Sequence, residues 1–224
     1  MSEVIISVRG EHETRLAPER GTVHLTVQTE GPERGAVVER VAALALPVRE
    51  QLAERASAGT VAEWSSQRAS VWANRPWNAD GKQLALVHYA SVEFTATFTD
   101  FAALSWWVGD IAERDGVQVS TVTWSLSPET ARATEASVAA EAVRTAVARA
   151  TAYAAAIDRT SVTPLEIADV GLLARAESES PAFTPKMLRA AAMSADSAGG
   201  GPAVELQPAD ITVSAAVEAR FTAR

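Results

Sequence analysis

One stretch in the second half of the chain most restricts its fold. Residues 129–157 contain neither Gly nor Pro, and nearly half of them are Ala, so one helix of ~43 Å is predicted. Ser127, Pro128 and Glu129 precede it as a cap hydroxyl, a first-turn proline and an acid, which is typical of a helix start. Because the stretch has few large apolar side chains, we expect it to pack closely against a sheet.

Seven stretches are predicted to be β-strands, most of them because apolar and polar residues alternate along them. The turn signal Asn-Ala-Asp-Gly at residues 78–81 lies between two of these stretches, so residues 61–99 are predicted to form one long hairpin. Gly10 is expected at a bulge or at a strand end. Trp124 is expected on the opposite face of its strand from Val119. The strands are residues 4–9, 22–28, 61–73, 92–99, 117–126, 162–173 and 211–222.

Two further helices complete the predicted elements. One follows Pro32 and ends at Gly59, and Pro47 is expected to kink or split it. The other covers residues 101–115, after the capping residue Asp100. The order β-β-α-β-β-α-β-α-β-loop-β predicts an α+β fold, with antiparallel sheets, long hairpins and helices packed on one face.

The length of 224 residues fits a single domain that spans residues 1–224. Residues 174–202 differ in composition from the rest, because they hold an acidic Ser-rich segment ending at Pro181 and the Gly199-Gly200-Gly201-Pro202 sequence. We expect a flexible loop there.

The charge balance restricts the partners. A net charge of −8 without a basic cluster argues against nucleic acid and against docking on anionic membranes. No window reaches 18 apolar residues, so no membrane insertion is expected. Glu3 stands where a signal peptide would carry basic residues, so we expect a cytoplasmic protein. The absence of Cys excludes disulfides and thiolate chemistry.

No catalytic signature is found. Neither a nucleophile elbow nor a phosphate-binding loop occurs. His12 and His24 approach each other across the expected first hairpin, but the spacing places no third metal ligand. No pair of carboxylates is singled out for acid–base chemistry. We therefore expect no catalytic residue, no cofactor and no metal site.

Large aromatic side chains are the most unusual feature of the sequence. On the long hairpin, Trp64 and Trp72 are expected to point the same way, since both are even-numbered. Trp106 and Trp107 are adjacent on a helix, so one is expected in the core and the other near the surface. Tryptophan beside arginine is typical of interface anchors. Packing under a helix, a subunit interface and a ligand groove remain alternatives for the candidate residues, which are Trp64, Trp72, Arg75, Trp77, Trp106 and Trp107.

Five short motifs carry a family resemblance. Residues 6–11 read I-S-V-R-G-E, residues 17–23 read A-P-E-R-G-T-V, and residues 89–94 read Y-A-S-V-E-F. The Ala-rich segment 141–156 and residues 206–215, L-Q-P-A-D-I-T-V-S-A, complete the series. In this order the chain resembles the SIMPL-domain family, which includes bacterial periplasmic immunogenic proteins. The resemblance implies an α+β fold and a tendency to self-assemble, and it supplies no catalytic residues.

These observations lead to three hypotheses. The first is a non-enzymatic, self-associating homo-oligomer, acting as a scaffold in stress handling by analogy with the family's envelope members. The second is a binding module in which residues 174–202 fold over a peptide or small ligand beside the tryptophans. The third is an unrecognised enzyme, which would require a closed pocket with clustered ionisable groups.

Overall fold

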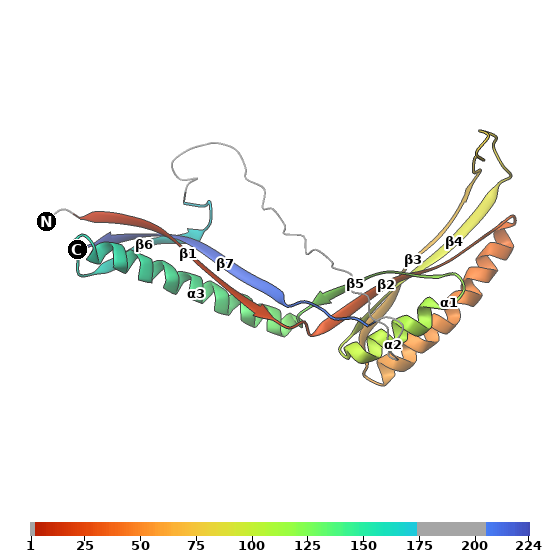
Figure 1. Cartoon of the computed structure of the whole chain (residues 1–224), viewed down its shortest axis with the longest axis horizontal. Coiled ribbons are helices and arrows are strands. Elements are labelled where there is room, and N and C mark those ends of the chain that lie inside the picture. Colours follow the sequence, from red (N-terminus) through yellow and green to blue (C-terminus); the bar gives the residue numbers. More distant parts are fainter. Residues whose placement is uncertain (1–2, 174–204) are drawn as a thin grey trace. The chain divides into compact units, whose positions relative to one another are not determined.

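The computed structural model of the chain describes residues 3–173 and 205–224, so the loop expected at residues 174–202 lies outside the described residues. The described residues contain three helices and two antiparallel sheets, which confirms the α+β class and the predicted order of elements (Figure 1). The elements are β1 (Val4–Leu16), β2 (Arg20–Gly31), α1 (Arg34–Ser57), β3 (Val61–Asn74), β4 (Val87–Phe98), α2 (Phe101–Ala112), β5 (Val117–Ser125), α3 (Pro128–Ala155), β6 (Val162–Asp169) and β7 (Ile211–Ala223).

The chain separates into two compact units, each with a sheet and a hydrophobic core of its own. Among the described residues, unit 1 consists of residues 3–16, 128–173 and 210–224, and unit 2 consists of residues 17–127 and 205–209. The organisation of residues 1–224 as a single domain stays a prediction.

Unit 1 is a three-stranded sheet in the order β1-β7-β6 under the helix α3. The buried face of α3 carries one residue every four positions, and four of these five residues are Ala: Val138, Ala142, Ala146, Ala150 and Ala154. Gly10 lies opposite this row, where a Cβ atom would come within 2.0 Å of the Ala142 carbonyl oxygen. Gly10 is therefore inside β1, paired with Val217, and not at a bulge or a strand end. It allows the helix to approach closely.

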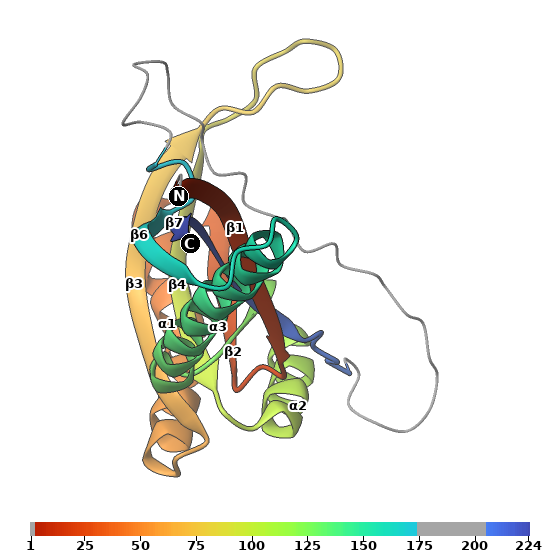
Figure 2. The ribbon, with the colours of Figure 1, turned by 90° about the vertical axis from the view of Figure 1, so that its left-hand side faces the viewer.

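The width of α3 determines which strands it covers. A helix with its side chains is about 10–12 Å wide and strands are about 4.8 Å apart, so one helix covers roughly two strands. Accordingly, α3 packs over β1 and β7 and barely touches β6. Figure 2 shows β6 to one side of α3.

Unit 2 is a four-stranded sheet in the order β3-β4-β2-β5, and α1 and α2 cover one of its faces. The helix α1 continues through Pro47 from Arg34 to Ser57, so the expectation that it is split there is wrong. Val37, Val41 and Leu52 are among its buried residues, and the packing of this apolar row against the sheet outweighs the backbone hydrogen bond that the proline removes.

The first two strands do not form a hairpin with each other. The strand β1 pairs with β7, whereas β2 pairs with β4 and β5. His12 and His24 therefore belong to different sheets, and the expected approach of these histidines across a hairpin is wrong. Both strands have the alternation of half-buried strands, which does not specify the partner.

A β-bulge explains the position of Trp124. In the pairing of β2 with β5, Leu25 lies opposite Val119 and His24 lies opposite Thr121, so Ser120 is an extra residue. An extra residue reverses the alternation beyond it. Val119 and Trp124 consequently both pack against the core of unit 2, and the expectation of opposite faces is wrong.

We predict that Gly10→Ala destabilises the protein by about 1–3 kcal/mol or more, because the added methyl group must displace the α3 backbone. Gly35→Ala is the matched control, since a Cβ atom at Gly35 meets no atom within 4 Å. The control should preserve or slightly raise stability, because Ala favours a helix more than Gly does. Urea unfolding followed by circular dichroism measures both variants. A Gly10→Ala variant as stable as the wild type would contradict the close packing.

Candidate functional site

The end of the β3–β4 hairpin is shaped by its turn. The Asn78 Oδ1 atom accepts hydrogen bonds from the backbone amides of Asp80 (3.1 Å) and Lys82 (2.8 Å). Gly81 has a φ of 71°, in the left-handed region that glycine adopts easily. Beyond the named strands, Trp77 and Gln83 form a further antiparallel bridge. The predicted turn is therefore confirmed, and it carries the hairpin past the ends of β3 and β4.

Residues 71–86, here called the hairpin tip, expose several large apolar side chains. Trp77 is 67% exposed and Trp72 is 45% exposed. Trp72 stacks on Tyr89 of the neighbouring strand, with ring centroids 5.4 Å apart and an interplanar angle of 11°. Arg75 is exposed beside them. The exposed large apolar residues of the tip are Val71, Trp72, Trp77, Leu84 and Leu86.

Trp64 and Trp72 lie on opposite faces of the sheet, so the expectation that they point the same way is wrong. Trp64 pairs with Ala96 and packs against the core of unit 2, whereas Trp72 pairs with Tyr89. The register shifts between Ser66 and Arg68, where Gln67 is the extra residue. The bulge thus reverses the alternation between the two tryptophans. Nothing in the local sequence indicates it.

The adjacent tryptophans of α2 divide as the helical geometry predicts. Trp107 is 1% exposed, its ring contacts that of Phe98 with a centroid distance of 5.3 Å, and its Nε1 atom donates a hydrogen bond to the Gln51 Oε1 atom at 3.1 Å. Trp106 is 61% exposed. The core position of one tryptophan and the surface position of the other are confirmed.

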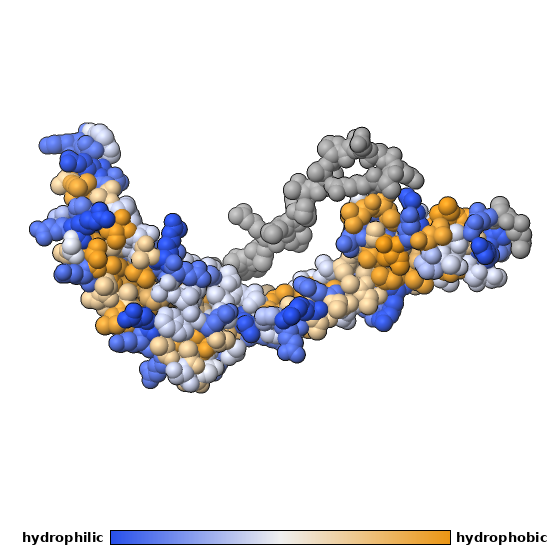
Figure 3. Space-filling model, turned by 180° about the vertical axis from the view of Figure 1, so that it is seen from behind, coloured by the Kyte–Doolittle hydropathy of each residue, from blue (hydrophilic) through white to orange (hydrophobic). Residues whose placement is uncertain are grey.

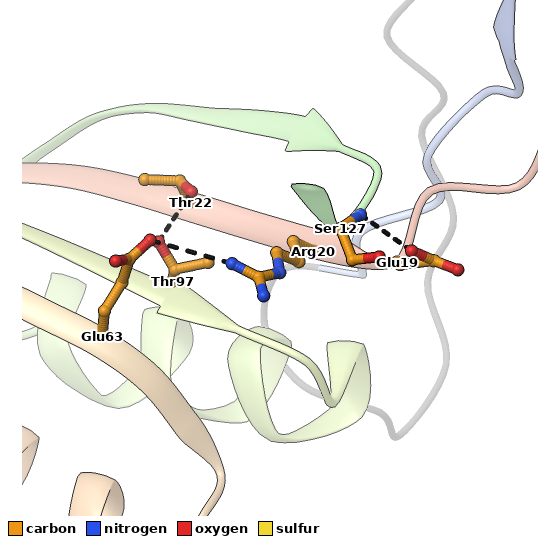
Figure 4. Close-up of polar contacts among 6 residues, drawn as sticks. All are labelled: Glu19, Arg20, Thr22, Glu63, Thr97 and Ser127. Carbon is orange, nitrogen blue, oxygen red and sulfur yellow. Dashed lines mark hydrogen bonds and ion pairs between the residues drawn. The ribbon is translucent and has the colours of Figure 1, made fainter. Parts of the chain in front are cut away.

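Away from the hairpin tip, the face of the unit 2 sheet that α1 and α2 leave open is polar. Arg20 of β2 reaches across β4 to Glu63 of β3 at 3.9 Å, next to the hydrogen-bonded pair Thr22 and Thr97, whose Oγ1 atoms are 2.9 Å apart (Figure 4). A second hydroxyl pair, Ser65 with Thr95, continues the pattern at 2.8 Å. This face is therefore unsuited to purely hydrophobic contacts, in contrast to the hairpin tip.

Figure 4 also shows a contact that sequence reasoning missed. The Glu19 carboxylate accepts a hydrogen bond from the Ser127 backbone amide at 2.7 Å. Ser127 immediately precedes α3, so Glu19 satisfies a backbone donor near the start of that helix. Glu19 belongs to the motif at residues 17–23, and only the folded chain shows what it contacts.

Unit 1 has an apolar surface that sequence reasoning did not single out. It comprises β6, the residues after it and the end of α3, and we call it the β6 surface. Leu165 and Ile167 lie on β6 itself, and both are about half exposed because α3 does not cover this strand. Figure 3 shows hydrophobic residues reaching the surface of both units. The large exposed apolar residues of the β6 surface are Tyr153, Ile157, Leu165, Ile167, Val170 and Leu172.

Ionisable groups form no enclosed cluster in the described part of the chain. A hollow of about 390 Å³ lies beside Glu11, His12 and Glu13, but all three residues are exposed, and the two carboxylates form ion pairs with Arg9 and Arg15. Residues 3–173 and 205–224 hold no group of three or more side chains that could bind a metal ion. No helix among these residues is long and apolar enough to cross a membrane.

These features define a class of protein: an α+β chain with two antiparallel sheets, each covered by helices on one face, and with exposed aromatic and aliphatic surfaces. Residues 6–221 match the SIMPL family, which is described as a protein of unknown function (DUF541). The chain belongs to this family, which confirms the resemblance drawn from its motifs. A comparison with curated proteins returns no match.

We predict that the two tryptophans of α2 differ sharply in their contribution to stability. Trp107→Ala should lower the free energy of unfolding by about 3–5 kcal/mol, because it opens a cavity and leaves Gln51 without its indole partner. Trp106→Ala should change it by less than about 0.5 kcal/mol. Urea unfolding of the two variants tests this, and similar losses in both would show that Trp106 also contributes to the fold.

Proposed function

We propose that the protein is a non-enzymatic protein that acts by self-association, with the hairpin tip as a contact surface between copies. The exposure of Trp72 and Trp77 on the tip is the observation that carries the proposal. Large aromatic side chains are enriched at the centres of protein interfaces, where burying them contributes much of the binding energy. In the cell, the proposed assembly would act as a scaffold in stress handling, by analogy with envelope members of the family.

The candidate interface residues now fall into two groups. Trp64 and Trp107 pack in the core of unit 2, so their substitution would act through stability rather than through a contact between copies. Trp72, Arg75, Trp77 and Trp106 are exposed and can take part in an interface directly.

Geometry favours the hairpin tip over Trp106 as the main contact. Trp77 shares the tip with four other exposed large apolar residues, all within residues 71–86 of one hairpin. On α2, Trp106 is the only large apolar residue that the structure shows as exposed. Clustered apolar surface marks interaction sites, whereas single exposed apolar residues are normal on protein surfaces.

We predict that the wild-type protein has a mass in solution several times 23.6 kDa and that Trp77→Ala shifts it toward smaller species. Light scattering on a sizing column, at several concentrations, measures this. Leu46→Ala is the matched control, because it removes an exposed apolar side chain from α1 of the same unit. A wild type that is a strict monomer would contradict the proposal, and so would an unchanged mass in Trp77→Ala.

A binding module is the second candidate, and the stacked pair of Trp72 and Tyr89 favours it. Both rings extend from the open face of the sheet, which also carries hydroxyl groups such as those of Ser65 and Thr95. An aromatic platform beside polar groups suits a peptide or a small ligand. The contribution expected from residues 174–202 lies outside the described residues. Quenching or a blue shift of tryptophan fluorescence on adding fractions of cell extract, lost in Trp72→Ala, would favour this candidate over self-association.

A further inference from the structure

The β6 surface combines an exposed apolar strand with a hollow. The hollow has a volume of about 490 Å³ and lies between the end of α3 and the start of β6. Ala154, Ala155 and Val162 form the apolar part of its lining, and Asp158 and Arg159 belong to the polar part. This volume lies within the range of pockets that receive ligand-sized groups, so it can accept one large aromatic side chain.

The β6 surface carries more acids than bases, and the hairpin tip carries more bases than acids. Asp158 and Arg159 both line the hollow, Glu166 lies on β6, and Asp169 ends β6. Among the described residues, Glu166 pairs with Arg220, and no ion pair involves Asp158 or Asp169. The hairpin tip carries two bases, Arg75 and Lys82, and one acid, Asp80, and no ion pair among the described residues involves either base. A contact between two hairpin tips would bring together two surfaces of net positive charge, whereas a contact between a tip and a β6 surface would bring a net positive surface to a net negative one.

We propose that the hairpin tip of one copy binds the β6 surface of a second copy, with Trp77 in the hollow beside the start of β6. This inference rests on the proposed self-association and names the partner surface. An exposed aromatic side chain that enters a partly apolar hollow with charged groups around it is typical of the residues that contribute most of the binding energy at protein interfaces. Since the two surfaces differ, each copy can bind one neighbour through its tip and another through its β6 surface.

Mixing two variants tests this arrangement. Trp77→Asp removes the anchor and places an acid against Asp158, and Ile167→Arg places a positive charge on the β6 surface against Arg75 and Lys82. Each variant alone should have a mass of 23.6 kDa. A mixture should form a one-to-one complex of twice that mass, because the Trp77→Asp copy keeps an intact β6 surface and the Ile167→Arg copy keeps an intact tip. Light scattering on a sizing column measures all three samples.

Ile5→Arg is the matched control for the β6 surface. Ile5 is exposed on β1 and lies opposite Thr222, on the face of the same sheet that points away from α3. This variant should assemble like the wild type. Circular dichroism and thermal unfolding check that every variant is folded, as expected for substitutions at exposed side chains.

The outcomes separate this inference from the proposed function. If Ile167→Arg keeps the wild-type mass, or if the mixture forms no complex, the tip does not bind the β6 surface, although self-association itself would stand. If the wild type is a monomer at every concentration, self-association fails and this inference fails with it. Loss of assembly in Ile5→Arg as well would show that the effect is not specific to the β6 surface.

Discussion

The contact of alanine with glycine between α3 and β1 is the constraint on which unit 1 depends. The row Ala142, Ala146, Ala150 and Ala154 replaces the long apolar side chains that usually separate a helix from a sheet. Gly10 has no side chain that would keep α3 away from the strand. Beside it, the Arg149 guanidinium donates a hydrogen bond to the Arg9 carbonyl at 2.7 Å. Small side chains bury little apolar area each, but they bring the helix close to the sheet. Many weak dispersion contacts then form along the long helix and together stabilise the packing.

This close packing also determines what stays uncovered. Two helices suffice for the four strands of unit 2, but unit 1 has one helix for three strands. A helix whose sheet-facing row is alanine has no long side chains on that row to extend over the third strand. Leu165 and Ile167 of β6 therefore remain exposed, although their apolar character would normally place such residues in a core. The same feature that stabilises unit 1 leaves the surface on which the proposed contact between copies depends.

The tryptophans show how far local sequence reasoning extends to a candidate site. Trp106 and Trp107 were separable in advance because the angle between adjacent helical residues is fixed by backbone geometry. The turn at Asn78 was predictable because it depends on the chemistry of a few neighbouring residues. The faces of Trp64 and Trp72 were not predictable, because one bulge residue, Gln67, reverses the alternation and its position depends on the pairing with β4. The β6 surface was missed because its exposure depends on which strands α3 covers. The helix packs over β1 and β7 and barely touches β6, although β6 is the next element in the sequence.

The sequence by itself determined the elements of this protein, their order, the α+β class and the family. These follow from local periodicity, from capping and turn residues, and from motifs that are read along the chain. Only the tertiary structure decided which strands pair, that β1 and β2 belong to different sheets, which tryptophans are buried and which apolar strand lacks a cover. The physical reason is that alternation specifies two faces of a strand but neither its neighbour nor its register, which depend on the combined packing of residues distant in the chain.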